Sequence, residues 1–155
     1  MTVYPSLAAL QPLVGRDVGL SDWIVVDQAR IDRFAEATDD HQWIHVDAER
    51  ARMGPYGTTI AHGYLTLSLL PAFFDSAFRI EGLRMSINYG LNRVRFPAPV
   101  PADSRLRARF KLLAYEPLDG GAQLVVEATI ERDGSERPVC VAESVSRRFV
   151  EQAAP

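Results

Sequence analysis

Residues 34–65 read FAEATDDHQWIHVDAERARMGPYGTTIAHGYL. This stretch contains all three histidines of the chain, the consecutive acids Asp39 and Asp40, and a glycine, Gly63, at the start of an apolar segment. The segments after it have the composition of β-strands. We therefore expect the chemistry of the protein to lie in residues 34–65. We expect the later strands to cover this region and to pair with it.

Asp40 and His45 are the two residues that we expect to carry out chemistry. Because they are five positions apart, a regular helix would place them about 140° apart around its axis. In an irregular turn both side chains can face one cavity and hold a water molecule between them. The carboxylate can then accept a proton from that water, and the imidazole can orient the water or return a proton. An acid and a histidine at this spacing also occur by chance, so the pair alone is a weak signal.

The spacing of His41 and His45 offers a different interpretation, because histidines at i and i+4 can bind a metal ion from one face of a helix. In a zinc-protease helix the residue after the first histidine is the glutamate base, whereas this chain has Gln42. Another histidine, His62, would have to arrive from a different element. We therefore expect no metal ion at this site.

Ala61-His62-Gly63 begins the most hydrophobic predicted helix, residues 61–78. The first amides of a helix have no partner within it, and glycine allows a ligand to approach the backbone closely. The Gly63 N–H is therefore a candidate donor to a substrate carbonyl that becomes negatively charged. Two structural interpretations stay open: Gly63 permits tight packing of the helix on a sheet, and His62 is a buried, hydrogen-bonded core residue.

The pattern along the chain predicts one α+β domain over residues 1–155. Helical signals cover residues 5–15, 27–38, 47–53 and 61–78, with Asp27 as the cap of the second and Pro71 as a kink or break in the last. Strand signals cover residues 21–26, 85–96, 104–114, 123–131 and 138–150. Turn sequences join the last three strands into an antiparallel meander. No repeat or linker divides the chain.

The strand at residues 104–114 alternates apolar with basic residues, which predicts one buried face and one solvent-exposed face. Its buried positions would be Leu106, Ala108, Phe110 and Leu112. The basic positions could form a stripe for nucleic acid, but cross-strand pairing with acids on the neighbouring strands can neutralise them. Those acids are Glu127, Glu131 and Glu143.

Composition argues against several classes of function. The 155 residues carry a formal net charge of −3, which gives no general attraction to nucleic acid or to an anionic membrane. The longest apolar run, residues 65–74, is about half a bilayer span and contains Pro71, so no transmembrane helix is expected. The single cysteine, Cys140, cannot form an internal disulfide, and the N-terminus lacks the basic start of a secretory signal. We therefore expect a cytoplasmic protein.

Residues 34–63 resemble the hydratase signature of the MaoC-like dehydratases, a family that contains the (R)-specific enoyl-CoA hydratases and the NodN-like proteins. The matching pattern is Phe34-Ala35…Asp40-x-Gln42-x-Ile44-His45-x-Asp47…Ala51…Tyr56-Gly57…Ile60-Ala61-His62-Gly63. The resemblance implies the hot dog fold, an antiparallel sheet wrapped around a long central helix. It also implies a homodimer in which two such sheets pair edge to edge, with the pockets near the dimer interface.

The resemblance further implies roles for individual residues. Asp40 and His45 match the catalytic pair that activates water, and Gly63 matches the glycine whose amide binds the thioester carbonyl. Along the same stretch, Gln42 and His62 would border the substrate. Ser68, one turn further along the central helix, would line the acyl pocket or instead bond to the backbone.

Three positions depart from the usual family motif, which has glycine, asparagine and proline where this chain has Asp39, Gln42 and Trp43. Aspartate adopts the left-handed conformation more readily than most residues, so Asp39 can replace the glycine. Gln42 keeps the amide on a longer arm. Trp43 loses the rigidity of proline and adds bulk, which changes the shape of the pocket and so the acyl chain length that fits.

The reaction implied by the resemblance is the reversible hydration of a trans-2-enoyl thioester to a 3-hydroxyacyl thioester, by analogy the (R) isomer. The carrier would be coenzyme A or an acyl carrier protein, and no metal or redox cofactor is needed. Two alternatives stay open. A hot dog thioesterase would release free thiol, and an acyl-thioester binding protein would have the pocket without turnover.

Overall fold

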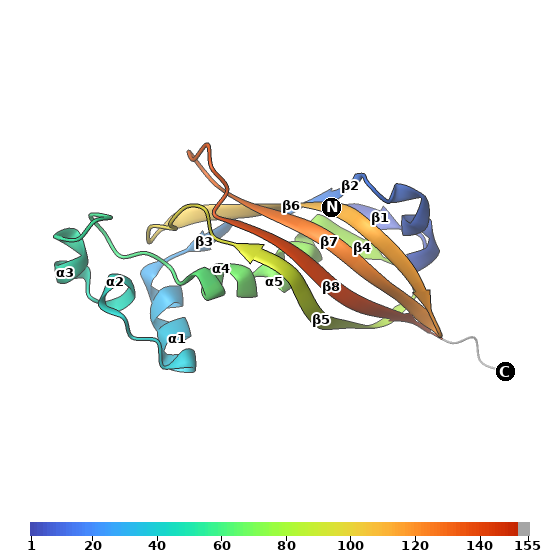
Figure 1. Cartoon of the computed structure of the whole chain (residues 1–155), viewed down its shortest axis with the longest axis horizontal. Helices are drawn as coiled ribbons and strands as arrows, with labels where there is room; N and C mark the ends of the chain where they lie inside the picture. Colours follow the sequence, from blue (N-terminus) through green and yellow to red (C-terminus); the bar gives the residue numbers. More distant parts are fainter. Residues whose placement is uncertain (152–155) are drawn as a thin grey trace.

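The computed structural model describes residues 1–151 (Figure 1). Its helices are the 3₁₀ helix η1 (Leu7–Leu13) and the α-helices α1 (Gln28–Thr38), α2 (Trp43–Val46), α3 (Ala48–Arg52), α4 (Gly63–Ser68) and α5 (Leu70–Ala77). Its strands are β1 (Thr2–Tyr4), β2 (Asp17–Leu20), β3 (Ile24–Val26), β4 (Phe78–Ile80), β5 (Leu83–Arg95), β6 (Ser104–Leu118), β7 (Gly121–Arg132) and β8 (Cys140–Val150).

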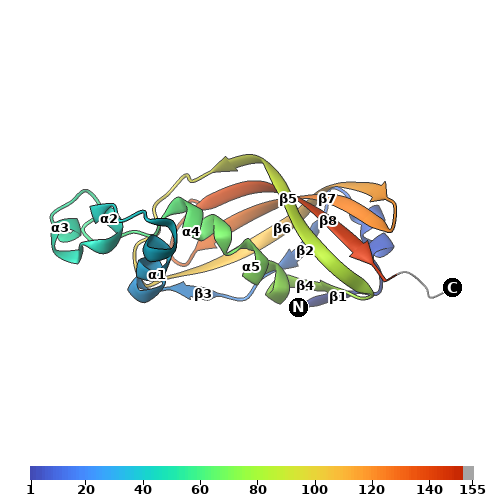
Figure 2. The same cartoon turned by 90° about the horizontal axis from the view of Figure 1, so that it is seen from below.

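The main sheet is antiparallel, and its strands follow the order β2-β6-β7-β8-β5, with β3 also paired to β6. Strands β6, β7 and β8 form the predicted meander, and β5 pairs with β8 along one edge of the sheet. A small parallel pair, β1 with β4, lies beside the main sheet. Helices α4 and α5 run across one face of the curved sheet (Figure 2). This sheet wrapped around a helix is the hot dog fold that the resemblance implied.

The core lies between that helix pair and the sheet. The four apolar positions predicted on β6, Leu106, Ala108, Phe110 and Leu112, are fully buried. The Phe110 ring stacks on Phe74 of α5, with 4.1 Å between the ring centroids. The alternating pattern therefore predicted correctly which face of β6 meets the helix.

The opposite face of β6 carries the basic residues, and acids neutralise much of it. The Nε of Arg107 lies 2.9 Å from a carboxylate oxygen of Glu131, and Lys111 lies opposite Glu127 in the ladder. Glu143, however, lies opposite Arg93 of β5 rather than beside this stripe, so that part of the prediction was wrong. The strand order explains this, because β7 separates β6 from β8.

The predicted helix at residues 61–78 is two helices with a break at Leu69. Pro71 lies at the start of α5, where its missing N–H removes no intrahelical hydrogen bond, so the predicted break is confirmed. The predicted strand at residues 21–26 is regular only at its end, in β3. Ser21 causes the interruption: its hydroxyl accepts the hydrogen bond of the Ala108 N–H at 2.8 Å and so separates β2 from β3.

Within residues 1–151, no helix combines the length and the apolar composition that crossing a bilayer requires.

Candidate active site

The turn that carries Asp40 begins where α1 ends. Asp27 caps the start of α1, because its carboxylate accepts the Arg30 N–H at 2.8 Å. At the other end Asp39 adopts the left-handed conformation, with φ 56° and ψ 21°. This conformation ends the helix and redirects the chain, and the Asp40 carbonyl then lies beside His62, the residue before α4. Aspartate tolerates it better than most residues, which is how the chain manages without glycine at this position.

His45 lies in α2, a single helical turn, and its side chain is buried. Its Nδ1 lies 2.6 Å from the carbonyl oxygen of Ile60. Since a carbonyl oxygen can only accept, Nδ1 carries the proton in the neutral ring and Nε2 keeps a free lone pair. Gln28 of α1 donates to the carbonyl oxygen of His45 at 2.8 Å and so fixes the backbone of this turn.

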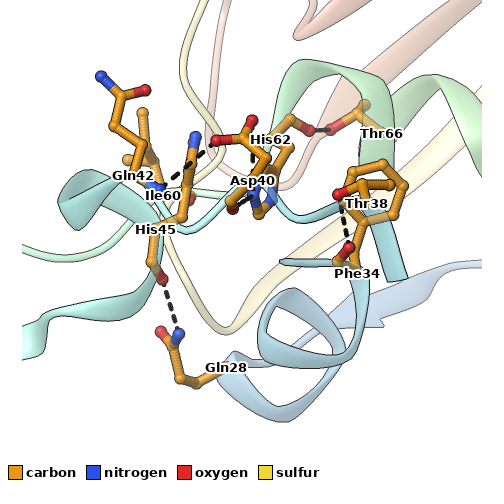
Figure 3. Close-up of polar contacts among 9 residues, drawn as sticks. All are labelled: Gln28, Phe34, Thr38, Asp40, Gln42, His45, Ile60, His62 and Thr66. Atoms are coloured by element: carbon orange, nitrogen blue, oxygen red, sulfur yellow. Dashed lines mark hydrogen bonds and ion pairs between the residues drawn. The ribbon is translucent and has the colours of Figure 1, made fainter. Parts of the chain in front are cut away.

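His62 is the residue directly before α4, and it is 2% exposed. Its ring stacks on that of His45, with 3.7 Å between centroids. Its Nε2 lies 2.9 Å from the backbone carbonyl of Asp40 (Figure 3). One side-chain atom from each of Asp40, His45 and His62 lies within 4.8 Å of the other two. The structure thus brings Asp40 and His45 together in the irregular turn, and it adds His62.

A cavity of about 330 Å³ opens beside His45. Gly63 and Thr66 of α4 form part of its wall, and the remaining lining residues are Tyr56, Ile60, Ala61, Phe96, Pro97, Ala98, Pro99, Val100 and Val139. Among the described residues no backbone carbonyl accepts the Gly63 N–H. A Cβ at Gly63 would lie 3.0 Å from the ring of Phe96, so a side chain here would require that ring to shift. The free amide and the His45 ring therefore border one cavity.

The pKa of His45 is lowered from its ordinary value of 6.5. Burial is the largest cause, because it disfavours the charged ring, and the neighbouring His62 acts in the same direction. The hydrogen bond to Ile60 and the charge of Asp40 oppose this shift without cancelling it. His45 is therefore neutral at pH 7 and has the protonation state that a proton acceptor needs.

The structure does not assemble the His41 and His45 pair. The side chain of His41 is 47% exposed and lies 3.9 Å from Glu36. Asp40, His45 and His62 are also residue types that bind zinc. The two stacked rings, however, have centroids 3.7 Å apart and planes inclined by only 25°, so their in-plane lone pairs run side by side rather than towards one ion.

Two other predicted site residues lie away from the cavity. The side chain of Gln42 is exposed and points away from Asp40 and His45 (Figure 3). Its backbone N–H lies 3.4 Å from the Asp40 carboxylate. Ser68 donates to the Leu65 carbonyl at 2.7 Å and lines a separate hollow beside β5. The expectations that Gln42 and Ser68 border the substrate are therefore not met in this cavity. The reasons are that Gln42 is the N-cap residue directly before α2 and that Ser68 faces the opposite side of α4.

The family model for the MaoC like domain matches residues 9–134, and the chain belongs to this family. The 3-hydroxyacyl-thioester dehydratase Z of Mycobacterium tuberculosis (strain ATCC 25618 / H37Rv) is 51% identical over 148 residues, which are 95% of this chain and 98% of the relative. Nodulation protein N of Rhizobium leguminosarum bv. viciae is 48% identical over 141 residues, 88% of this chain and 87% of the relative.

Among solved structures, the R-hydratase PhaJ1 from Pseudomonas aeruginosa in the unliganded form is similar with a TM-score of 0.70. The match covers 98% of this chain and 93% of that structure, at 19% sequence identity. At this identity the likeness concerns the fold, and it agrees with the hot dog arrangement described above.

Proposed function

We propose that this protein is an enoyl-thioester hydratase, which adds water reversibly to a trans-2-enoyl thioester and gives the 3-hydroxyacyl thioester, as the (R) isomer. The observation that carries the proposal is that a neutral His45 and Gly63, whose N–H has no backbone acceptor among the described residues, border one cavity, while the Asp40 carboxylate lies within 4.8 Å of a ring nitrogen of His45. The name of the mycobacterial relative, a 3-hydroxyacyl-thioester dehydratase that matches nearly the whole chain, supports the same reaction in its reverse direction.

The proposed chemistry uses these groups in turn. A water molecule donates one hydrogen bond to the free Nε2 of His45, which orients it, and the other to the Asp40 carboxylate. As the water oxygen bonds to C3 of the substrate, Asp40 accepts the proton that the water loses. The electron pair of the C2–C3 double bond moves to the thioester oxygen, which the Gly63 N–H stabilises. Asp40 then returns the proton to C2 on the same face, so that one water is added in all.

The substrate would be an acyl thioester of coenzyme A or of an acyl carrier protein. Hydration transfers no net electrons, so we propose that no redox cofactor takes part. We also propose that no metal ion takes part, because the two histidine lone pairs do not converge. Activity that persists after dialysis against a chelator would support this, and stoichiometric zinc required for activity would contradict it.

We further propose that the protein works as a cytoplasmic homodimer. Strand β5 has no partner on its outer edge among the described residues, and several of its apolar side chains are exposed. An unpaired edge strand of this length is a natural place for a second copy to add its own.

The test is the hydration of crotonyl-CoA, followed by the loss of the ultraviolet absorbance of the enoyl thioester. Asp40→Asn and His45→Gln should each lower kcat by about 10²-fold or more, as expected when general acid–base groups are removed. Asp39→Asn and His41→Gln are matched controls, because they change the adjacent acid and the exposed histidine.

Near wild-type activity in both Asp40→Asn and His45→Gln would show that the assigned roles are wrong. If the wild-type protein instead releases free thiol from acyl-CoA, it is a thioesterase. If it binds the thioester without converting it, it is a binding protein. The thiol assay and the hydration assay should therefore be run on the same preparation.

A further inference from the structure

The His62 ring contacts the proposed site on more than one side. It lies between the ring of Phe34 in α1, at 5.0 Å between centroids, and the ring of His45 in α2, at 3.7 Å. With 2% exposure it has almost no contact with solvent. The ring thus packs the end of α1 and the turn of α2 against the start of α4.

The hydrogen bond of His62 reaches the residue that is proposed to accept the proton. Its Nε2 donates to the backbone carbonyl of Asp40 at 2.9 Å, and the same nitrogen lies 3.9 Å from an Asp40 carboxylate oxygen. This bond holds Asp40 immediately after the chain reversal at Asp39. Half of the Asp40 side chain is exposed, so its position depends on its backbone more than on surrounding side chains.

The backbone of His62 belongs to the other half of the site. His62 is the residue directly before Gly63, and its carbonyl accepts the Thr66 N–H at 3.1 Å in the first turn of α4. A movement of His62 would therefore move the Gly63 amide relative to Asp40 and His45. No other residue among those described contacts both rings and the Asp40 carbonyl while leading directly into Gly63.

We infer that His62 is a positioning residue for the hydration reaction: with the proton on Nε2 that it donates to the Asp40 carbonyl, it fixes the distance between the Asp40–His45 pair and the Gly63 amide. The inference rests on the proposed function and deepens it. It gives His62 a role in holding the site together rather than in contacting the substrate.

The two ring nitrogens of His62 determine its tautomer. Nε2 faces the Asp40 carbonyl oxygen, which can only accept, so Nε2 carries the proton. Nδ1 is buried and has no hydrogen-bond partner among residues 1–151. A proton on Nδ1 would therefore be a buried donor without an acceptor.

Two substitutions separate the hydrogen bond of His62 from its packing. His62→Phe keeps an aromatic ring between Phe34 and His45 but cannot donate to Asp40. His62→Gln loses the ring, but its side-chain amide can reach the position of Nε2 and donate to the Asp40 carbonyl. We expect His62→Phe to lower kcat for crotonyl-CoA by about 10- to 100-fold with a smaller change in KM, because small displacements of reacting groups have effects of this size. His62→Gln should recover at least part of the loss, and His41→Gln is the control.

Nuclear magnetic resonance of ¹⁵N-histidine-labelled protein gives a readout that does not depend on activity. Long-range proton–nitrogen correlations should show His45 as the Nδ1–H tautomer and His62 as the Nε2–H tautomer.

The outcomes are distinct. If His62→Phe keeps wild-type kcat, or if His62 of the wild type carries its proton on Nδ1 rather than on Nε2, the inference is wrong. If His62→Phe does not fold, as judged by its melting temperature, a comparison of His62→Gln with His62→Leu decides: the inference is supported if His62→Gln, which can still donate to the Asp40 carbonyl, keeps a clearly higher kcat than His62→Leu, and it is wrong if the two folded variants lose activity equally. If the wild-type protein hydrates no enoyl thioester, the proposed function fails, while the tautomers still test the arrangement of the rings.

Discussion

Protonation of His45 should determine how far the proposed reaction extends to acid pH. Its ring is held as the Nδ1–H tautomer by Ile60, and burial keeps its pKa below 6.5. Protonation would place a hydrogen on Nε2 and remove the lone pair that orients the water. The neutral state is therefore both the one that the fold favours and the one that the chemistry requires.

A pH profile tests this directly. We expect kcat/KM for crotonyl-CoA to be flat around neutral pH and to fall on the acid side with an apparent pKa below 6.5. The free energy of unfolding should also decrease at acid pH. The pKa of His45 is lower in the folded chain than in the unfolded chain, so the unfolded chain binds more protons as the pH falls below 6.5. His45→Gln should remove this contribution to the pH dependence of unfolding. An acid limb centred clearly above 6.5 would contradict the assignment.

At the residue scale, the sequence predicted that Asp40, His45 and Gly63 lie near one another, as they do in the structure, but it did not predict the contacts that hold them there. Spacing and residue type were enough to name an acid, a histidine and an exposed amide. The bond from Gln28 to the His45 carbonyl spans 17 positions, and nothing local to either residue indicates it. The contacts of His62 likewise depend on how α4 meets the turn after α1. Gln42 was misplaced because its side-chain direction follows from its place at the start of α2.

At the scale of elements, the start of α4 and the loop before β6 meet closely at Gly63. A Cβ there would lie 3.0–3.1 Å from the Phe96 ring, and Phe96 is itself part of the cavity wall. We expect Gly63→Ala to fold but to lower kcat/KM by about 10-fold or more, because either the ring moves into the cavity or the amide moves away from the substrate oxygen. Steady-state hydration of crotonyl-CoA measures the effect.

A double-mutant cycle with Phe96→Ala identifies the cause. Removing the ring creates the space that the new methyl group needs, so Gly63→Ala should cost much less activity in the Phe96→Ala background than in the wild type. Equal losses in both backgrounds would show that the ring is not the reason for the glycine.

The elements were predictable where one local signal decided them. The strict alternation on β6 fixed its buried face, and Pro71 indicated the break between α4 and α5. The strand at residues 21–26 was predicted too long because the Ser21 hydroxyl takes a place in the ladder that a backbone carbonyl would normally occupy. Strand β2 was not predicted at all. Its four residues, Asp17–Leu20, show little apolar pattern and are ordered by pairing with β6, more than 80 positions away.

At the scale of the whole molecule, strand β5 is the feature that a single chain leaves incomplete. It is 13 residues long and pairs only with β8 among the described residues. Met85, Ile87, Tyr89 and Leu91 on it are 41–57% exposed. A long edge strand with exposed apolar side chains favours association, and such edges are usually covered in stable proteins.

We therefore expect two copies to pair through β5, and the protein to elute with twice the 17.2 kDa mass of one chain in size-exclusion chromatography with light scattering. Ile87→Lys should shift the protein to the mass of one chain, because a charge would then be buried in the interface. Val25→Lys is the matched control, since Val25 is similarly exposed but lies on β3 at the opposite edge of the sheet. A wild-type monomer would contradict the homodimer, whereas a dimer that persists in Ile87→Lys and dissociates in Val25→Lys would place the interface at the other edge.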